Sequence, residues 1–164
     1  MKNNLNISAK QDRYELQQFL TFSVNAQEYA VDIMSVLEIK GWTETTRLPN
    51  VPQYLRGVIN LRGLIIPIFD LKSRFHNSLT EATPKHVVIM LNIDNRSVGI
   101  LVDSVSDILN ITSDQIKPAP TQDMQTEDEY VTGLLSLENR TVVLIDVRVL
   151  FTSKHLEHAN IQEN

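Results

Sequence analysis

The chain contains an internal repeat. Five residues of the first half (Tyr54, Gly57, Leu61, Asp70 and Phe75) are matched by identical residues 76 positions later, with no gap between them: Tyr130, Gly133, Leu137, Asp146 and Phe151. Further upstream, residues 19–31 are echoed in character by residues 88–100, at an offset of 69. A duplicated unit predicts two similar subdomains with a seam between them, and such seams often hold ligands or partners.

Short apolar segments punctuated by Gly, Pro and Asn predict many short strands. The expected strands are residues 16–24, 29–33, 35–40, 57–61, 64–69, 86–93, 97–108, 130–137 and 142–146. Residues 25–28 and the Arg62-Gly63 pair have the composition of turns. Asp70 and Asp146 each end a strand, and we expect each to cap a short helical turn. The pattern is typical of small barrels, so the expected fold class is mainly β: two small barrels with little helix.

Bulk composition excludes several classes of function. The 164 residues carry a net charge of −5 and contain no cysteine, which excludes thiolate catalysis, thiolate zinc sites and disulfides. No cluster of Lys and Arg is present, so we expect no nucleic-acid partner. No apolar run is long enough to span a bilayer, and no secretory leader precedes the strands. We expect a cytoplasmic protein with no membrane insertion, a loose arm over residues 1–15 and a polar tail over residues 152–164.

Candidate catalytic and metal-binding residues are few. The repeated pair Asp70 and Asp146 permits a hydrolase in which two carboxylates share a proton, but neither lies in a Gly-containing turn that would expose it, so helix capping is favoured. His155 and His158 are spaced to share a metal if they are helical, although a solvated tail is the simpler interpretation. We therefore predict no catalytic residue, no metal and no cofactor.

Two longer motifs give the chain a family resemblance. Residues 29–39 (YAVDIMSVLEI) and 52–71 (PQYLRGVINLRGLIIPIFDL) closely resemble the CheW family, the bacterial chemotaxis coupling proteins, and residues 98–109 and 130–134 support the match. The resemblance runs from about Leu16 to Phe151. It implies two intertwined, SH3-like, five-stranded β-barrels in one domain (16–151), with repeat units of about 17–75 and 86–151.

The resemblance also implies a function and partners. Members of the family are adaptors without catalytic activity. They join the cytoplasmic signalling tip of methyl-accepting chemoreceptors to the regulatory domain of a CheA-type histidine kinase, which itself has a CheW-like fold. The two folds can alternate in rings beneath membrane-associated receptor arrays. Service in a different, non-flagellar chemosensory pathway is an alternative, and an unrelated peptide-binding barrel is another.

Four residues match family positions linked to coupling or partner binding: Val36, Glu38, Gly57 and Arg62. The charges of Glu38 and Arg62 could contact a partner directly. They could equally pair with each other and shape a loop, an exposed pair worth about 0–1 kcal/mol. For Gly57, backbone geometry is the favoured explanation, because Gly133 repeats it.

A groove between the barrels is the second candidate binding site. Ile33, Val36, Val87, Leu101 and Val102 are apolar residues that could line it. The apolar face of a receptor helix could lie in such a groove. For each of these residues, an ordinary place in the hydrophobic core is the competing interpretation.

Overall fold

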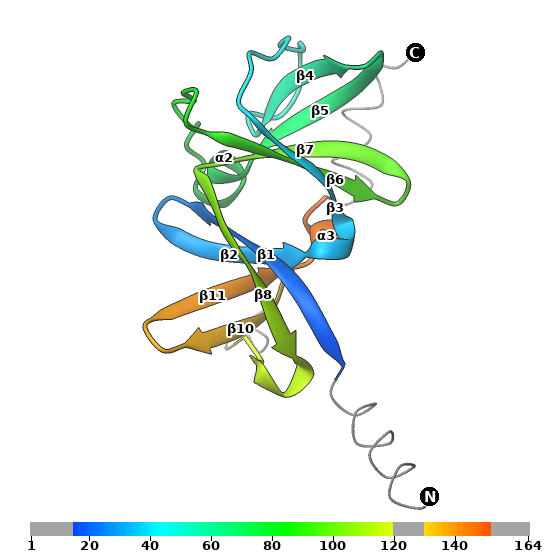
Figure 1. The fold of residues 1–164 in the computed structure, drawn as a ribbon. Coiled ribbons are helices and arrows are strands. Elements are labelled where there is room, and N and C mark those ends of the chain that lie inside the picture. The colour runs from blue at the N-terminus through cyan, green and yellow to red at the C-terminus, as the bar shows by residue number, and fades with distance from the viewer. Residues whose placement is uncertain (1–14, 120–129, 152–164) are drawn as a thin grey trace, which may run out of the picture.

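The computed structural model describes residues 15–119 and 130–151, and strands dominate it (Figure 1). The first half contributes β1 (Leu16–Val24), β2 (Gln27–Asp32), β3 (Val36–Gly41), β4 (Leu55–Leu61) and β5 (Leu64–Asp70). The second half contributes β6 (Val87–Ile93), β7 (Arg96–Val102), β8 (Ser104–Thr112), β9 (Ile116–Lys117), β10 (Val131–Leu137) and β11 (Arg140–Ile145). The short helical segments are η1 (Ile33–Ser35), α2 (Leu71–His76), η2 (Ser113–Gln115) and α3 (Val147–Leu150).

The strands form two sheets that lie one above the other in Figure 1. The upper sheet has five strands in the order β3-β6-β7-β5-β4, and the lower has six in the order β8-β1-β2-β11-β10-β9. The predicted fold of two intertwined, mainly β subdomains is confirmed. The sixth strand of the lower sheet is the two-residue β9, which pairs with β10 through Ile116 and Lys117. Its counterpart in the first repeat is a single bridge between Thr46 and Val58.

Each repeat divides between the two sheets. In the first, β1 and β2 belong to the lower sheet, while β3, β4 and β5 belong to the upper one. In the second, β6 and β7 join the upper sheet, and β8 to β11 return to the lower one. The joins are equivalent: β2 runs parallel to β11, and β7 runs parallel to β5. The two sheets are therefore built from both halves of the chain.

One expected strand was wrong. The single strand predicted over 97–108 is two strands, β7 and β8, which lie in different sheets. The chain passes from one sheet to the other at Asp103, whose backbone N–H donates to the carbonyl of Ser23 (2.9 Å). The Asp103 carboxylate accepts from the backbone N–H of Asn25 (2.8 Å) in the β1–β2 turn. The apolar run 98–102 ends here at Asp103 and Ser104, and strand-like apolar residues resume at Val105, so the pattern alone reads equally well as one strand interrupted by polar residues.

Hairpin turns place the strands in register. Asn25 and Ala26 both have positive φ, as do Asp94 and Asn95 at the equivalent position of the second repeat. Two consecutive residues of positive φ match the twist of antiparallel strands better than ordinary turns do. The expected turn at Arg62-Gly63 is confirmed, whereas the turn predicted over residues 25–28 is limited to Asn25 and Ala26, because Gln27 and Glu28 already pair with β1.

The core has three parts. The largest cluster lies between the sheets and includes the fully buried Phe22, Phe69, Leu91 and Phe151. A smaller cluster on the lower sheet and another on the upper sheet fill the two barrels. The rings of Phe69 and Phe151 lie 4.6 Å apart between their centroids, so aromatic packing ties the end of β5 to the end of the second repeat. Among the described residues, no helix is both long and apolar enough to span a membrane.

The two predicted helix caps are confirmed. The Asp70 side chain accepts from the backbone N–H of Ser73 at the start of α2 (3.2 Å). Asp146 does the same for Arg148 at the start of α3 (2.9 Å). Both short helices lie in the middle of the molecule, near the junction of the sheets (Figure 1). The expected arm and tail fall outside the described residues except for Glu15, and so do His155 and His158.

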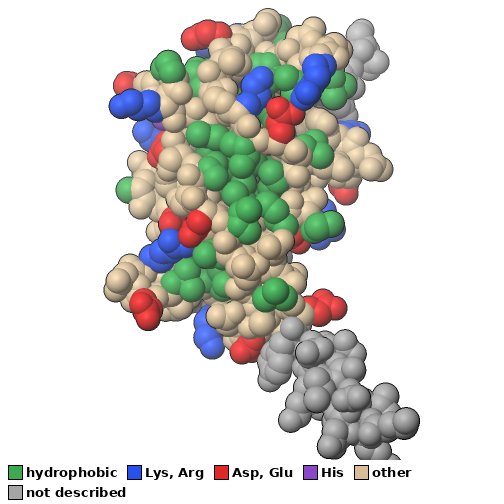
Figure 2. Space-filling model, viewed as in Figure 1, with side chains coloured by type: hydrophobic (Ala, Val, Ile, Leu, Met, Phe, Trp, Pro, Cys, Tyr) green, Lys and Arg blue, Asp and Glu red, His purple; other side chains and the backbone are tan. Residues whose placement is uncertain are grey.

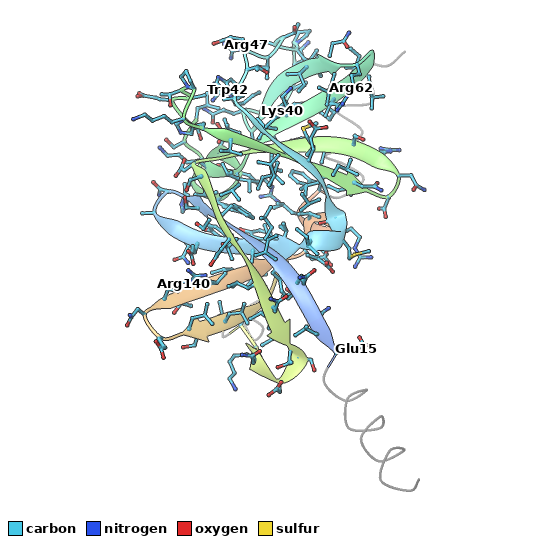
Figure 3. All side chains as sticks on the ribbon, in the orientation of Figure 1. Glu15, Lys40, Trp42, Arg47, Arg62 and Arg140 are labelled. Atoms are coloured by element: carbon cyan, nitrogen blue, oxygen red, sulfur yellow. The ribbon has the colours of Figure 1, made fainter. Side chains whose placement is uncertain are left out.

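A buried threonine and an ion-pair network join β1 and β8 to β11. The Thr21 hydroxyl donates to the Asp107 carboxylate and accepts from the Asp107 backbone N–H. Arg140 on β11, labelled in Figure 3, contacts the same carboxylate (3.2 Å) and pairs with Glu28 (3.1 Å). The hydrogen bond from Thr21, with a smaller contribution from Arg140, holds the pKa of Asp107 below its ordinary value, against the effect of burial.

This network predicts a loss of stability in acid. Because folding lowers the pKa of Asp107, the ionised carboxylate stabilises the fold at any pH above the ordinary aspartate value of about 3.9. The contribution is lost as pH falls from there through the lower folded-state pKa. Asp107→Asn should therefore be destabilising at neutral pH, and its deficit should shrink below about pH 4. Urea unfolding of both proteins from pH 7 to pH 3 measures this, and a deficit that is constant with pH would contradict it.

Candidate functional site

Glu38 and Arg62 lie together on the surface of the upper sheet. The Arg62 Nη2 atom is 2.6 Å from the Glu38 Oε2 atom, and the two side chains are 73 % and 41 % exposed. Glu38 is on β3, at one edge of the sheet, and Arg62 is at the tip of the β4–β5 hairpin, from which Figure 3 shows it projecting. The structure thus brings together two of the four predicted partner-binding residues. An exposed pair of this kind contributes about 0–1 kcal/mol to folding. Its effect on stability therefore does not explain why the two charges are present.

The hairpin turn fixes the position of Arg62. Arg62 has a φ of 54° and Gly63 a φ of 86°, and the Asn60 side-chain oxygen accepts from the Gly63 backbone N–H (2.9 Å). A residue with a side chain rarely adopts positive φ, since its Cβ then crowds the backbone. Arg62 adopts this strained conformation in the turn, and its guanidinium reaches Glu38 on β3.

A shallow apolar pocket adjoins the ion pair. It has a volume of about 280 Å³ and is lined by Leu37, Leu61, Leu64, Ile66, Met90 and Ser97 in addition to Glu38 and Arg62. Leu37 and Leu64 are each 54 % exposed, which is unusual for leucine. Our sequence reasoning missed both. The signal was available, because Leu37 and Ile39 alternate with polar residues along β3 and occupy its outward face.

Gly57 and Val36 are placed differently. Gly57 is buried in β4 with a φ of 145°, and a Cβ atom there would lie 2.2 Å from the carbonyl oxygen of Thr46. Only glycine fits this close approach, so the structure gives Gly57 a geometric role. Val36 begins β3, is partly buried, and packs against the main core beside Ile33. Contact of either residue with a partner stays a prediction.

The five candidate groove residues do not form one exposed surface. Leu101 and Val102 are 0 % and 1 % exposed and belong to the core, so they cannot line an open groove in this structure. Ile33, Val36 and Val87 are partly buried at the margin of the main cluster. For these two residues the competing interpretation, an ordinary place in the core, holds, because they end β7, a central strand covered on both faces.

Apolar side chains do gather at the centre of one face. Figure 2 shows them as a band between β3 of the upper sheet and β1 and β8 of the lower sheet, with charged side chains above and below. Exposed members of these strands include Ile39 (46 %) and Ile108 (51 %). A contiguous apolar band with a charged border is typical of a surface that binds another protein.

The two repeated aspartates serve the fold. Asp70 is completely buried, and its carboxylate accepts from Thr80 through both the backbone N–H and the hydroxyl (2.8 Å each) and pairs with Arg56 (3.1 Å). Asp146 caps α3 and contacts Arg148 (3.4 Å). The hydrogen bonds of each aspartate go to its own surroundings and none joins the two carboxylates. Among residues 15–119 and 130–151, no three His, Asp or Glu side chains come together as metal ligands would.

Comparison with known proteins matches the chain over nearly its whole length. Residues 18–155 match the family model described as CheW-like domain. The Chemotaxis protein CheW of Klebsiella aerogenes is 43 % identical over 140 residues, which cover 85 % of this chain and 84 % of that protein. The protein of the same name from Bacillus subtilis is 30 % identical over 143 residues, or 87 % and 92 % of the two chains.

The fold matches a solved structure as well. The crystal structure of the scaffolding protein TtCheW from Thermoanaerobacter tengcongensis has a TM-score of 0.76 and 28 % sequence identity, and the match covers 86 % of this chain and 96 % of that one. Both repeats contribute strands to both sheets, and sequence and structure match CheW proteins over most of the chain. The chain therefore belongs to the CheW-like family of chemotaxis proteins.

Proposed function

We propose that this protein is a non-catalytic adaptor that couples chemoreceptors to a CheA-type histidine kinase. The observation that carries the proposal is the similarity of nearly the whole chain to proteins named Chemotaxis protein CheW. In this role the protein works in the cytoplasm and is recruited to receptor arrays at the membrane. Its partners are the cytoplasmic tip of a methyl-accepting receptor and the regulatory domain of the kinase, with which it alternates in rings.

The surface of the described residues supports such a role in two places. The apolar band between β3 of the upper sheet and β1 and β8 of the lower sheet suits the apolar face of a receptor helix. The pocket beside Glu38 and Arg62 combines exposed leucines with a charged rim, which is the anatomy of a small protein interface. We assign coupling to the second surface, with Glu38, Arg62 and the residues around them as contacts and Gly57 as the residue that holds the β4 backbone in place.

A reconstituted array tests the proposal. The protein is mixed with a chemotaxis histidine kinase and a clustered receptor cytoplasmic fragment, and sedimentation and kinase autophosphorylation are followed in the same tubes. The kinase should sediment and become active only when this protein is present. Failure of the protein to bind either partner would overturn the adaptor role.

Arg62→Ala locates the site. We expect it to lower receptor-dependent kinase activity by about tenfold, equivalent to 1.4 kcal/mol of lost interaction, while the free energy of unfolding changes by about 1 kcal/mol or less. Arg47→Ala, which removes another exposed arginine of the same half of the chain, is the matched control and should leave coupling intact. Equal loss in both variants would mean that general charge, and not this site, supports coupling.

A further inference from the structure

A cavity of about 560 Å³ opens beside α3 in the lower half of the molecule. Its walls come from β1, η1, β10, β11 and the start of α3, and its polar lining includes Asp32, Asn92, Thr132, Asp146 and Arg148. Phe19, Ile116 and Leu144, which belong to the core of the lower barrel, form an apolar floor. The cavity is therefore the mouth of that barrel.

The internal repeat shows what occupies the equivalent place in the upper barrel. Asp146 corresponds to Asp70 and Thr132 to Arg56, each at the 76-residue offset. In the upper barrel, the Arg56 guanidinium lies 3.1 Å from the Asp70 carboxylate and donates to the carbonyl of Thr80 (2.6 Å). Ala82, two residues beyond, packs against the core of that barrel. There, an arginine and the chain segment around Thr80 enclose the carboxylate of Asp70.

The lower barrel lacks that arginine. Thr132 is too short to reach across, and its hydroxyl donates to the backbone carbonyl of Leu144 (3.3 Å). As a result the Asp146 side chain is 24 % exposed, whereas that of Asp70 is 0 % exposed. The same framework thus carries a carboxylate at the same position, and among the described residues its cation is the exposed Arg148 of its own helix (Nε–Oδ1 and Nη2–Oδ2, 3.4 Å each) in place of a residue equivalent to Arg56.

The electrostatics of the cavity favour a cation. The Asp32 carboxylate lines it together with Asp146. The hydrogen bond to Asp146, together with the charges of Asp146, Asp94 and Asp32, raises the pKa of the Arg148 guanidinium above its ordinary value. Arg148 itself lines the cavity and is 70 % exposed, so its contacts with Asp146 are made in solvent.

From these observations we propose that the cavity binds the guanidinium group of an arginine side chain supplied by a partner protein, with Asp146 as the main acceptor. Guanidinium is planar and presents paired donors to a carboxylate, which a lysine ammonium does not. The partner's arginine would stand where Arg56 stands in the other barrel. This site is separate from the Glu38–Arg62 surface, and it does not depend on the coupling role.

The first test uses N-acetyl-arginine amide as the probe and ¹⁵N-labelled full-length protein. Titration should shift the backbone amide signals of Thr132, Val147 and Arg148. N-acetyl-citrulline amide has nearly the same shape but no charge, and it should leave them unchanged. Asp146→Asn should weaken binding of the arginine probe at least tenfold. Equal shifts with the citrulline compound, or no loss of affinity in Asp146→Asn, would overturn the proposal.

A second variant places an arginine of the protein itself in the proposed site. Thr132→Arg copies Arg56 into the lower barrel, so it should raise the melting temperature when Asp146 is present and have no such effect in Asp146→Asn. It should also abolish binding of the probe. If the variant gains no stability and still binds the probe, the proposal fails. Nuclear Overhauser contacts from Thr132 to residues 152–164 would show that the chain closes the cavity itself, and would equally overturn it.

Discussion

Replacing Asp70 with alanine is expected to lower the free energy of unfolding by about 3–5 kcal/mol, the usual cost of breaking a buried ion pair by removing one partner. Asp70 is fully buried, and it accepts hydrogen bonds from Arg56, Ser73 and Thr80. Without the carboxylate, the Arg56 guanidinium, which is only 20 % exposed, loses its charge partner. The segment around Thr80 also loses its anchor to the upper barrel.

The internal repeat supplies the matched control. Asp146→Ala removes an identical residue at the start of the equivalent helix, but this carboxylate is partly exposed and its cation, Arg148, is in solvent. The cost should be that of an N-cap alone, about 0.5–2 kcal/mol. Chemical denaturation of the wild type and both variants measures the two losses side by side. Equal losses would show that burial and pairing of Asp70 add nothing to its capping role.

Gly57→Ala should produce the second large effect, a destabilisation of about 3 kcal/mol or more. The φ of 145° is available almost only to glycine, and a residue held in such a region costs of order 1–3 kcal/mol. The added Cβ would also lie 2.2 Å from the Thr46 carbonyl oxygen, and overpacking of this kind typically costs a further ~1–3 kcal/mol. Because the obstacle is backbone, no side chain can move aside to relieve it.

Gly41→Ala is the control for this substitution. Gly41 ends β3, has no atom within 4 Å of the position that a Cβ would take, and has no positive φ. Its replacement should change the free energy of unfolding by about 0.5 kcal/mol or less. Thermal and urea unfolding of both variants would check the prediction. If Gly57→Ala is as stable as Gly41→Ala, then β4 relaxes easily, and a defect in coupling could be assigned to a direct contact at Gly57.

The repeat and the turn residues allowed much of the fold to be predicted. Identical residues at a fixed offset indicated two related subdomains, and strand-ending aspartates indicated the two helix caps. Hairpin turns could be located because Asn, Asp and Gly tolerate positive φ. These features depend on a few neighbouring residues, and the sequence pattern displays such local chemistry directly.

Long-range features could not be predicted in the same way. The apolar residues on either side of Asp103 do not indicate which sheet they enter, so the passage there from one sheet to the other was missed. For the same reason Leu101 and Val102 were considered for a groove although they lie in the core. The Glu38–Arg62 contact joins residues 24 apart in the chain, and their charges alone allowed either pairing or contact with a partner. The cavity at the end of the lower barrel could not be predicted either. The side chain of Thr132 is shorter than that of Arg56 in the upper barrel, and the effect of this difference is visible only when the two barrels are compared in three dimensions.

The exchange of strands between the sheets has a consequence for synthesis of the chain on the ribosome. β1 pairs with β8, at Leu16 and Thr112, and β2 pairs with β11, at Glu28 and Val142. The first strands to emerge therefore have no complete set of neighbours until almost the last strand has been made. Because contacts between distant residues also slow folding, β1 and β2 must wait with their apolar side chains uncovered, while β3 to β7 complete the upper sheet among themselves. The two sheets therefore differ during synthesis: the upper sheet can form before the last strands exist, whereas the lower sheet needs both ends of the chain.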